Sequence, residues 1–268
     1  MRAYFYYITQ NAKSQAIAQS GTMDSMKILQ MNVWTGRIKG AIERFLKEND
    51  FDVICMQEAV WSEDIPELLD YYCTSVEQIK EASGLQYDFR SSAYYLEAMG
   101  GRIEQGIVIL SRSSIVESES KHILGEYKRI NDVYNSNNHN YCAQKVALEN
   151  GFVVVNYHGY WQSNPIGNET TVECMRKVAD MIRDEDRPTV MCGDLNVVAE
   201  SPAMRELDFM RNLTAENNNK QTLQNLKFVK DVACDHILIN EKVVAKNYQV
   251  HDQLVSDHKA VSAEIEII

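Results

Sequence analysis

Carboxylate, amide and imidazole side chains lie beside short apolar runs at widely separated points of the sequence. Strands that pair in a sheet end at a common edge, so distant segments could bring these groups to one rim. Carboxylate and amide oxygens suit a hard divalent cation, and an imidazole beside a carboxylate can move protons. The set therefore predicts metal-assisted hydrolysis of a phosphoester. Its members are Asn32, Glu58, His158, Asp194, Asn196, Asp235, Asp257 and His258.

Two of these residues follow apolar runs in the first quarter of the chain. Asn32 ends the first run, where its amide could hydrogen-bond a phosphate oxygen, support a metal ligand or simply satisfy a turn. Glu58 follows residues 53–57, and a carboxylate there needs a partner that a divalent cation would supply. An ordinary solvated loop acid is the alternative for Glu58 taken by itself.

The segment Gly193-Asp194-Leu195-Asn196 places a carboxylate and an amide two residues apart, just after a glycine. Gly193 allows the backbone to approach other groups closely. Asp194 can accept a proton from water, and Asn196 can hold the nucleophile or a phosphate oxygen. A plain Asx turn is the competing explanation for the same four residues.

Two histidines extend the set. His158 follows an apolar run, where it suits either catalysis or a structural hydrogen bond. His258 follows Asp257, and Asp235 opens another apolar run, so Asp235 could fix the tautomer of His258 while Asp257 faces a metal. A structural Asp–His pair would explain these residues too. The joint occurrence of all the groups beside strand-like runs favours a catalytic site.

The apolar pattern predicts the elements that must position these groups. Amphipathic periodicity predicts helices near residues 38–46 and 172–182, and we expect a variable helical stretch around residues 62–84. Because strands and helices interleave without strict βαβ regularity, we expect an α/β fold with mixed sheets covered by helices. The predicted strands are residues 27–33, 51–56, 106–110, 141–148, 152–157, 189–192, 237–239 and 260–267.

The chain has 268 residues, of which 45% are hydrophobic, and it can bury a sizeable core. No linker or internal repeat divides it, so we expect residues 26–268 to form a single domain. Residues 1–25 contain one short apolar cluster followed by polar residues, which predicts an N-terminal extension outside the core. The leader lacks a signal-peptide pattern and no run is apolar enough to cross a bilayer, so stable membrane insertion is not expected.

The net charge is −11, from 27 basic and 38 acidic residues. This excess disfavours a broad grip on a nucleic-acid backbone, although a local basic patch could still exist, and it also suits simple solubility. The six cysteines form no C-x-x-C pair and read as reduced thiols, which favours a cytoplasmic location. We also expect the protein to be a monomer.

From about residue 26 to 268 the chain resembles the endonuclease/exonuclease/phosphatase superfamily of deoxyribonuclease I-like phosphoesterases. The resemblance implies a four-layer α/β sandwich with two central mixed β-sheets flanked by helices. The segments that carry it are Leu29-Gln30-Met31-Asn32-Val33-Trp34, Gln57-Glu58, Glu104-Gln105-Gly106-Ile107-Val108-Ile109-Leu110-Ser111-Arg112, Asn156-Tyr157-His158, Gly193-Asp194-Leu195-Asn196, Asp235-His236-Ile237-Leu238 and Ser256-Asp257-His258.

The resemblance also implies a cofactor and its ligands. A Mg²⁺ or Mn²⁺ ion would be held chiefly by Glu58, with help from Asn32 and Asp257. Either Glu104 or Gln105 lies where relatives place a residue that supports the active-site histidine, and the sequence leaves the choice between them open.

The remaining site residues take catalytic roles by the same resemblance. Asp194 and Asn196 would orient the attacking water. His258 with Asp235 would act in acid–base catalysis or phosphate stabilisation, and His158 would contact the phosphate or assist the leaving group.

The chain departs from common family patterns at Trp34, at residues 159–161 after His158, and at residues 259–260 after His258, so no subfamily is assigned. We expect a nuclease or nucleotide phosphodiesterase, whose partner is a phosphoester in a nucleic acid or nucleotide. A phosphatase or a lipid phosphodiesterase, of inositol phosphate or sphingomyelinase type, is the alternative on the same fold. A non-catalytic binding protein is the alternative of another class.

Overall fold

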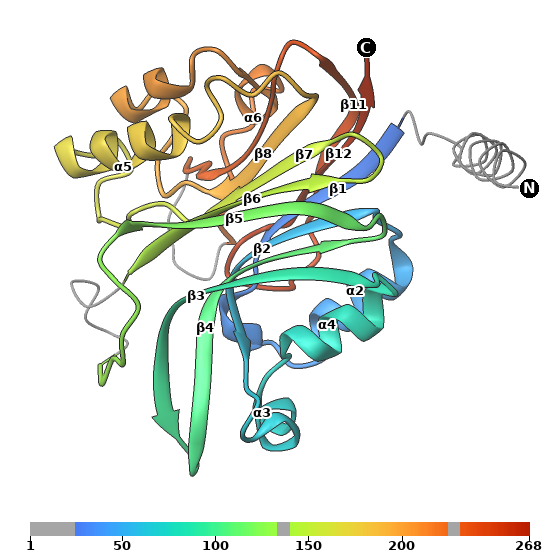
Figure 1. Ribbon diagram of the computed structural model, residues 1–268, viewed down its shortest axis with the longest axis vertical. Helices are drawn as coiled ribbons and strands as arrows, with labels where there is room; N and C mark the ends of the chain where they lie inside the picture. Colours follow the sequence, from blue (N-terminus) through green and yellow to red (C-terminus); the bar gives the residue numbers. More distant parts are fainter. Residues whose placement is uncertain (1–24, 133–139, 225–230) are drawn as a thin grey trace, which may run out of the picture.

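The computed structural model of the chain describes residues 25–132, 140–224 and 231–268. Within these ranges the strands form two six-stranded sheets that lie face to face (Figure 1). The first sheet has the order β11 (Val243–Val250), β12 (Val261–Ile267), β1 (Ser25–Asn32), β2 (Val53–Trp61), β4 (Gly101–Ser111) and β3 (Tyr87–Ala98). The second has the order β5 (Ile115–Leu124), β6 (Tyr141–Leu148), β7 (Val153–Tyr157), β8 (Thr189–Asp194), β10 (Asp235–Ile239) and β9 (Arg211–Asn212).

Both sheets are mixed, as the sequence predicts. β1 and β2 are parallel in the first sheet and β7 and β8 are parallel in the second, while the other described pairs are antiparallel. The carboxyl ends of β1, β2, β7 and β8 therefore meet at one end of the space between the sheets.

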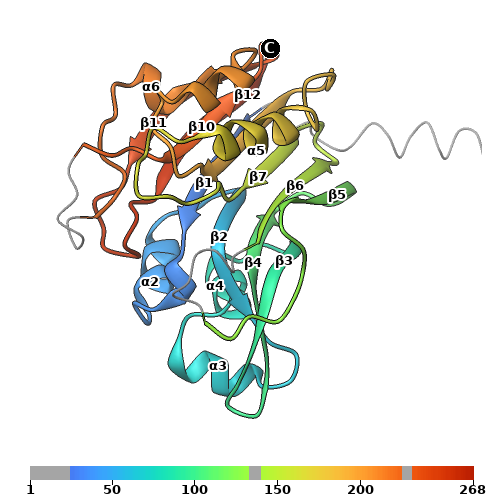
Figure 2. The same ribbon diagram turned by 90° about the vertical axis from the view of Figure 1, so that its left-hand side faces the viewer.

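Helices cover the outer face of each sheet (Figure 2). On the first sheet these are α2 (Ala41–Glu48) and α4 (Val76–Ser83), and on the second α5 (Glu169–Ala179) and the 3-10 helix η3 (Pro202–Leu207). The shorter elements are η1 (Trp34–Gly36), α3 (Pro66–Tyr72) beside the β3–β4 hairpin, and α6 (Leu213–Glu216). This arrangement confirms the predicted four-layer α/β sandwich.

The core divides into three layers because side chains alternate between the two faces of each strand. Ile28 on β1 and Cys192 on β8 face the space between the sheets. Leu29 packs outward with the helix residues Ile42 and Phe45, and Met191 packs outward in the cluster that contains the apolar face of α5. Central strands that are buried on both faces are the ones whose sequences read as continuous apolar runs.

The described strands that the sequence did not predict are β3, β5, β9 and β11, and they are the four edges of the two sheets. β5 is exposed along most of its length, and its sequence IVESESKHIL lacks an apolar run. Edge strands need only one apolar face and carry charged side chains that discourage pairing with other chains. Their sequences therefore lack the signal that identifies a central strand.

The proposed N-terminal extension lies outside the described residues, apart from Ser25, which begins β1 and pairs with Glu266 of β12. None of the helices in the described ranges has the length and apolar character needed to span a bilayer. The six cysteines are all free thiols, and five of them are buried.

Candidate active site

The inward-facing residues of the central strands change from apolar to polar toward one end of the sandwich. β1 continues from Ile28 to Gln30 and Asn32, and β8 continues from Cys192 to Asp194. All three polar side chains are at most 1% exposed. A buried polar group must find partners, so these side chains hydrogen-bond across the gap between the sheets.

A network of buried amides supports this polar end from within. Gln57 on β2 donates from Nε2 to Oδ1 of Asn156 on β7, at 2.7 Å. Asn156 donates from Nδ2 to the carbonyl oxygens of Met56 and Val108, at 3.0 and 3.1 Å. Asn156 thus links the two sheets directly behind the site, because its partners Gln57, Met56 and Val108 all belong to the other sheet.

Asn32 links two carboxylates at the rim. Its Nδ2 donates to Glu58 Oε1 at 3.1 Å and to Asp194 Oδ2 at 3.0 Å, and its Oδ1 accepts from the backbone N–H of Trp34 at 3.0 Å. The amide is thereby fixed in one orientation by groups from three segments. The structure thus brings together three residues that the sequence placed in the site.

Glu58 does not end its strand, as the sequence led us to expect. It lies inside β2, where the pairing with β4 shifts between Met56 and Ala59, and its φ is +53°. A bulge with a left-handed residue re-aims the side chain, and such backbone strain gathers at functional sites. The bulge turns Glu58 toward Asn32 although the strand continues past it.

The predicted Asp–His pair is present. His258 Nδ1 lies 2.9 Å from Asp235 Oδ2, and His258 Nε2 lies 3.7 Å from Asp194 Oδ2. Asp235 and Asp194 are directly opposite each other in the antiparallel pairing of β10 and β8. Gln30 donates from Nε2 to the second oxygen of Asp235, Oδ1, at 2.6 Å. Gln30 and His258 therefore each bind one oxygen of the Asp235 carboxylate.

His158 and Asn196 complete the rim. His158 Nε2 lies 3.8 Å from Asp194 Oδ2 and 4.0 Å from Glu58 Oε1. The Asn196 backbone N–H donates to Asp194 Oδ1 at 3.0 Å, and its side chain donates to the carbonyl of Gly159 at 2.9 Å. Asn196 therefore fixes Asp194 and also ties together the two loops that carry His158 and Asp194.

Close backbone contact between these loops explains Gly193. A Cβ atom at this position would overlap the carbonyl oxygen of Tyr157, the residue that precedes His158. Asn196, which closes the same turn, has a φ of +54°. The expected close approach at Gly193 is therefore present, and it sets the position of Asp194.

The charges at the rim shift the pKa values of Asp194 and His258 in opposite directions. Burial raises the pKa of Asp194. The nearby imidazoles of His258 and His158 and the hydrogen bond from Asn32 outweigh burial, and the pKa lies below its usual value. Burial lowers the pKa of His258, but Asp235 and Asp194 raise it well above its usual value. At neutral pH the site therefore holds an ionised Asp194 facing a protonated His258.

The carboxylate oxygens of Glu58 and Asp194, which converge on the Asn32 amide, are of the kind that a hard divalent cation prefers. Glu58 is half-buried, and no lysine or arginine in the described parts of the chain forms an ion pair with it. The protonated His258 offsets one of the two negative charges, and a divalent cation would balance the charge that Glu58 adds at the rim.

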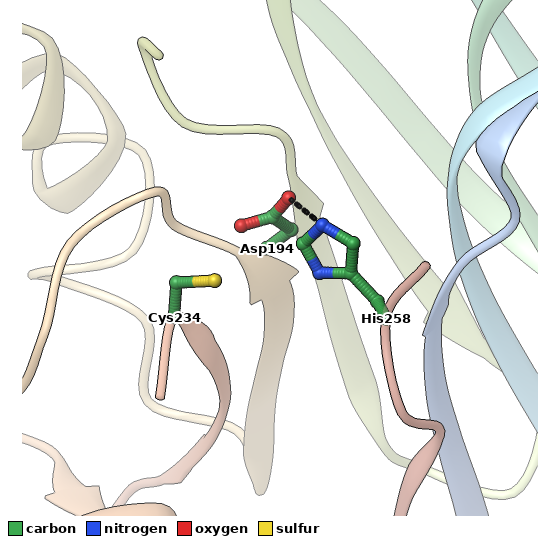
Figure 3. Close-up of side chains that lie close together, drawn as sticks. All are labelled: Asp194, Cys234 and His258. Atoms are coloured by element: carbon green, nitrogen blue, oxygen red, sulfur yellow. Dashed lines mark ion pairs between the residues drawn. The ribbon is translucent and has the colours of Figure 1, made fainter. Parts of the chain in front are cut away.

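A second cluster, Asp194, Cys234 and His258, has its ligand atoms within 4.8 Å of one another (Figure 3). Burial raises the pKa of the Cys234 thiol, and the carboxylates beside it raise the pKa further. A thiol must lose its proton to bind a metal, and His258 is protonated here. Without a bound metal, this cluster therefore holds its protons on Cys234 and His258, and Asp194 is its ionised member.

Asp257 is the third metal ligand that the resemblance implies. It is buried, and its Oδ1 accepts a hydrogen bond from the Ser256 hydroxyl at 3.2 Å. Its backbone carbonyl accepts from Gln224 N at 2.8 Å. The segment that carries Asp257 and His258 is thereby anchored.

Gln105, and not Glu104, faces the site. Gln105 lines a cavity together with Glu58 and His158. Glu104 lines a different cavity, forms an ion pair with Arg102 at 2.6 Å and accepts a hydrogen bond from Tyr127. Adjacent residues of a strand point to opposite faces, which separates the two.

Gln30 and Cys234 were not identified as site residues from the sequence. The sequence signal that could have identified Gln30 is its polar side chain in an apolar strand, two residues before Asn32. Cys234 has no such signal, because a thiol beside an apolar strand is typical of a core residue.

The sequence profile described as "Endonuclease/Exonuclease/phosphatase family" matches residues 29–258. A comparison with curated proteins gave no match. Among solved structures, an endonuclease/exonuclease/phosphatase family protein from Bacteroides thetaiotaomicron is similar with a TM-score of 0.66 and 16% identity, covering 91% of this chain and 98% of that one. The human Nocturnin catalytic domain with bound sulfate has a TM-score of 0.62 and 13% identity, over 91% and 95% of the two chains. A mannosyl-6-phosphatase from B. thetaiotaomicron has a TM-score of 0.63 and 16% identity, over 90% and 99%.

Proposed function

The chain belongs to the Endonuclease/Exonuclease/phosphatase family, whose members hydrolyse phosphoester bonds, and we propose that it is a divalent-metal-dependent phosphoesterase. The observation that carries the proposal is the convergence of Glu58, Asn32 and Asp194 beside the His258–Asp235 pair. The arrangement supports a site for one hard cation. Beside it lie Asp194, a carboxylate that would orient the nucleophile, and His258, a cationic hydrogen-bond donor.

Glu58 would hold Mg²⁺ or Mn²⁺ with help from Asn32 and Asp257. The bound ion would supply Lewis-acid stabilisation of the charge that develops on the phosphate. Asn32 limits where Glu58 can move, because its amide is already hydrogen-bonded to Asp194. The preorganised oxygen donors would thus select a hard cation over a soft one.

Asp194 would orient the attacking water and accept its proton. Its carboxylate is ionised, and hydrogen bonds from Asn32 and the Asn196 backbone fix both oxygens. A fixed acceptor restricts the water to one approach direction, which lowers the entropic part of the barrier.

His258 would act as a cationic donor to the phosphate and not as the base. A general base must be unprotonated at the working pH, whereas the pKa of His258 is raised well above its usual value by Asp235 and Asp194. Its Nδ1–H is directed to Asp235, which leaves Nε2–H to donate to a phosphate oxygen. His158, on the other side of Asp194, would contact a second phosphate oxygen or the leaving group.

The substrate we favour is a nucleotide or another small phosphoester. A net charge of −11 offers few cations outside the site to neutralise a long nucleic-acid backbone. The six free cysteines support a reducing, cytoplasmic setting, and we propose that the protein acts as a monomer.

The experiment that tests the proposal is hydrolysis of a panel of phosphomonoesters and phosphodiesters, from small esters to oligonucleotides, with Mg²⁺, with Mn²⁺ and in chelator. We expect turnover of small esters that requires an added cation, and no gain in kcat/KM as oligonucleotides lengthen. Full activity in chelator would contradict the metal assignment. A kcat/KM that rises with oligonucleotide length and falls steeply with salt would instead identify a nuclease with an extended basic groove.

A further inference from the structure

A cavity of about 400 Å³ opens beside the rim, and its wall includes Glu58 and His158 from the proposed site. Ligand pockets for small molecules have volumes of roughly 300–1,000 Å³. The cavity is therefore large enough for the organic group of a small ester, and its position next to the site residues makes it continuous with the place proposed for the phosphate.

Apolar side chains from four elements form most of the wall. Val60 comes from β2, Leu69 from α3, Leu96 from β3, and Ile103 and Ile107 from β4. Figures 1 and 2 show α3 beside the β3–β4 hairpin, away from the helices that cover the sheets. Val60, Leu69 and Ile103 belong to one buried cluster, so this wall is a packed surface that is already formed.

Among the described residues of the wall, the polar groups other than Glu58, His158 and Arg37 are uncharged. Gln105 and Tyr94 share a hydrogen bond, and burial raises the pKa of the Tyr94 hydroxyl, so it stays protonated and uncharged. Tyr141 OH accepts from Trp161 N at 3.3 Å. These groups could orient a ligand by hydrogen bonds without requiring a charge on it.

Positive charge is scarce around the cavity. Among the described residues that line it, the sole lysine or arginine is the exposed Arg37, whose guanidinium lies 5.0 Å from the centre of the Trp34 ring. A polyphosphorylated group would need several cations to replace its lost hydration. The wall therefore fits an uncharged group and rejects a polyanion.

We propose that this cavity binds the uncharged, largely apolar organic group of a small phosphoester, with its phosphate at the rim. The proposal rests on the proposed function for the position of the phosphate. It narrows the substrate class to esters of aromatic or aliphatic alcohols of small-molecule size, nucleoside-sized groups included, and excludes inositol polyphosphates.

Binding is measured first, by calorimetry in chelator, where turnover does not interfere. The probes are methyl phosphate, 2-naphthyl phosphate and inositol hexakisphosphate. Each buried methylene-sized unit contributes about a fourfold gain in affinity, so 2-naphthyl phosphate should bind at least about tenfold more tightly than methyl phosphate. Equal affinities for these two ligands, or tighter binding of inositol hexakisphosphate, would overturn the proposal.

Two tryptophan variants on β3 locate the binding. Leu96→Trp adds bulk to the cavity wall and should remove the preference for the naphthyl group while leaving methyl phosphate binding unchanged. Glu97→Trp is the matched control, since Glu97 is the next residue, is exposed and does not line the cavity; it should keep the preference. A preference that survives Leu96→Trp would place the naphthyl group elsewhere and contradict the proposal.

Turnover separates this proposal from the proposed function. With Mg²⁺, hydrolysis of the naphthyl ester should have a kcat/KM at least about tenfold higher than that of the methyl ester. Equal turnover of both esters would refute the cavity proposal while supporting a phosphoesterase. Naphthyl-selective binding without hydrolysis by any cation would refute the proposed function and retain the ligand site.

Discussion

At the scale of single residues, Asn32 determines how the rim is organised. Its amide reaches Glu58 in its own sheet and Asp194 in the other, and its oxygen is held by the backbone of Trp34. An asparagine suits this position because it can donate to two carboxylates while its oxygen accepts. The two carboxylates are thereby held close together, at a spacing that suits a bound divalent cation.

The first prediction concerns Glu58. Glu58→Gln removes one negative charge but keeps the shape, so we expect the Mg²⁺ concentration for half-maximal activity to rise at least about tenfold, with the melting temperature unchanged. The measurement is a Mg²⁺ titration of activity together with thermal denaturation.

Glu104→Gln is the matched control, because Glu104 carries the same group but pairs with Arg102 beside a different cavity. The Mg²⁺ dependence should stay that of the wild type in this variant. An unchanged Mg²⁺ dependence in Glu58→Gln, or an equal shift in both variants, would remove Glu58 from the metal site.

The sequence identified residue types well and their contacts less well. Asn32, Asp194 and His258 could be found because a polar group beside an apolar run is a local signal. The hydrogen bond from Gln30 to Asp235 joins residues 205 positions apart, and no local pattern indicates it. The choice between Glu104 and Gln105 likewise needed the strand's orientation, which sequence alone does not fix.

At the scale of elements, two backbone irregularities bring the site together. The bulge in β2 turns Glu58 inward, and the tight turn after β8 holds Asp194. The sequence predicts both strands, but it does not reveal the bulge, because the apolar pattern of β2 continues on both sides of Glu58. The edge strands were missed for a related reason. The apolar pattern of a sequence reflects how deeply a strand is buried, and edge strands are buried less than central ones.

The second prediction tests the close approach of β7 and β8. Gly193→Ala places a Cβ atom against the Tyr157 carbonyl, so we expect a loss of roughly 1–3 kcal/mol of unfolding free energy and a lower kcat, since Asp194 must shift. Urea denaturation and steady-state kinetics measure the two effects.

Gly84→Ala is the control for this substitution. Gly84 has a φ of +67° and open space around it, so alanine there should cost about 1 kcal/mol without changing kcat. A Gly193→Ala protein with wild-type stability and kcat would show that the contact does not position Asp194.

At the scale of the whole molecule, the two sheets are packed by apolar side chains over most of their interface and joined by hydrogen bonds at one end. Ile28 and Cys192 belong to the apolar region of this interface, and the Gln57–Asn156 hydrogen bond belongs to its polar end. The apolar part provides the stability, which frees the polar end to be specialised for chemistry. The resemblance and the mixed order of the elements predicted the four-layer architecture. The strands at the sheet edges, and their partners, could be identified only from the structure.

The third prediction concerns stability in acid. His236 is fully buried; its Nε2 contacts the Val197 carbonyl at 2.9 Å and its Nδ1 contacts Asn212 at 3.1 Å. Burial lowers the pKa of His236 below that of an unfolded chain, although the Val197 contact raises it in part. The unfolded state therefore binds more protons below about pH 6.5, and stability falls as the pH falls, by at most about 1.4 kcal/mol per pH unit.

Urea denaturation of wild type and His236→Gln at pH 7.5 and 5.5 checks this sign. The wild type should lose more unfolding free energy between the two pH values than the variant does. The comparison is needed because His258, whose pKa is raised, contributes with the opposite sign, its stabilisation being lost as the pH rises. Equal losses in the two proteins would exclude His236 as a source of acid sensitivity.

The central claim is that Asp194 and His258 carry out the chemical step of a metal-dependent phosphoester hydrolysis, and kcat for their variants tests it most directly. With saturating Mg²⁺ and the best small ester, Asp194→Asn and His258→Ala should each lower kcat by roughly 10²–10⁴-fold, the range expected when a general acid or base is removed. Circular dichroism should show the wild-type fold in both. A loss of less than tenfold in both folded variants would mean that the chemistry takes place elsewhere.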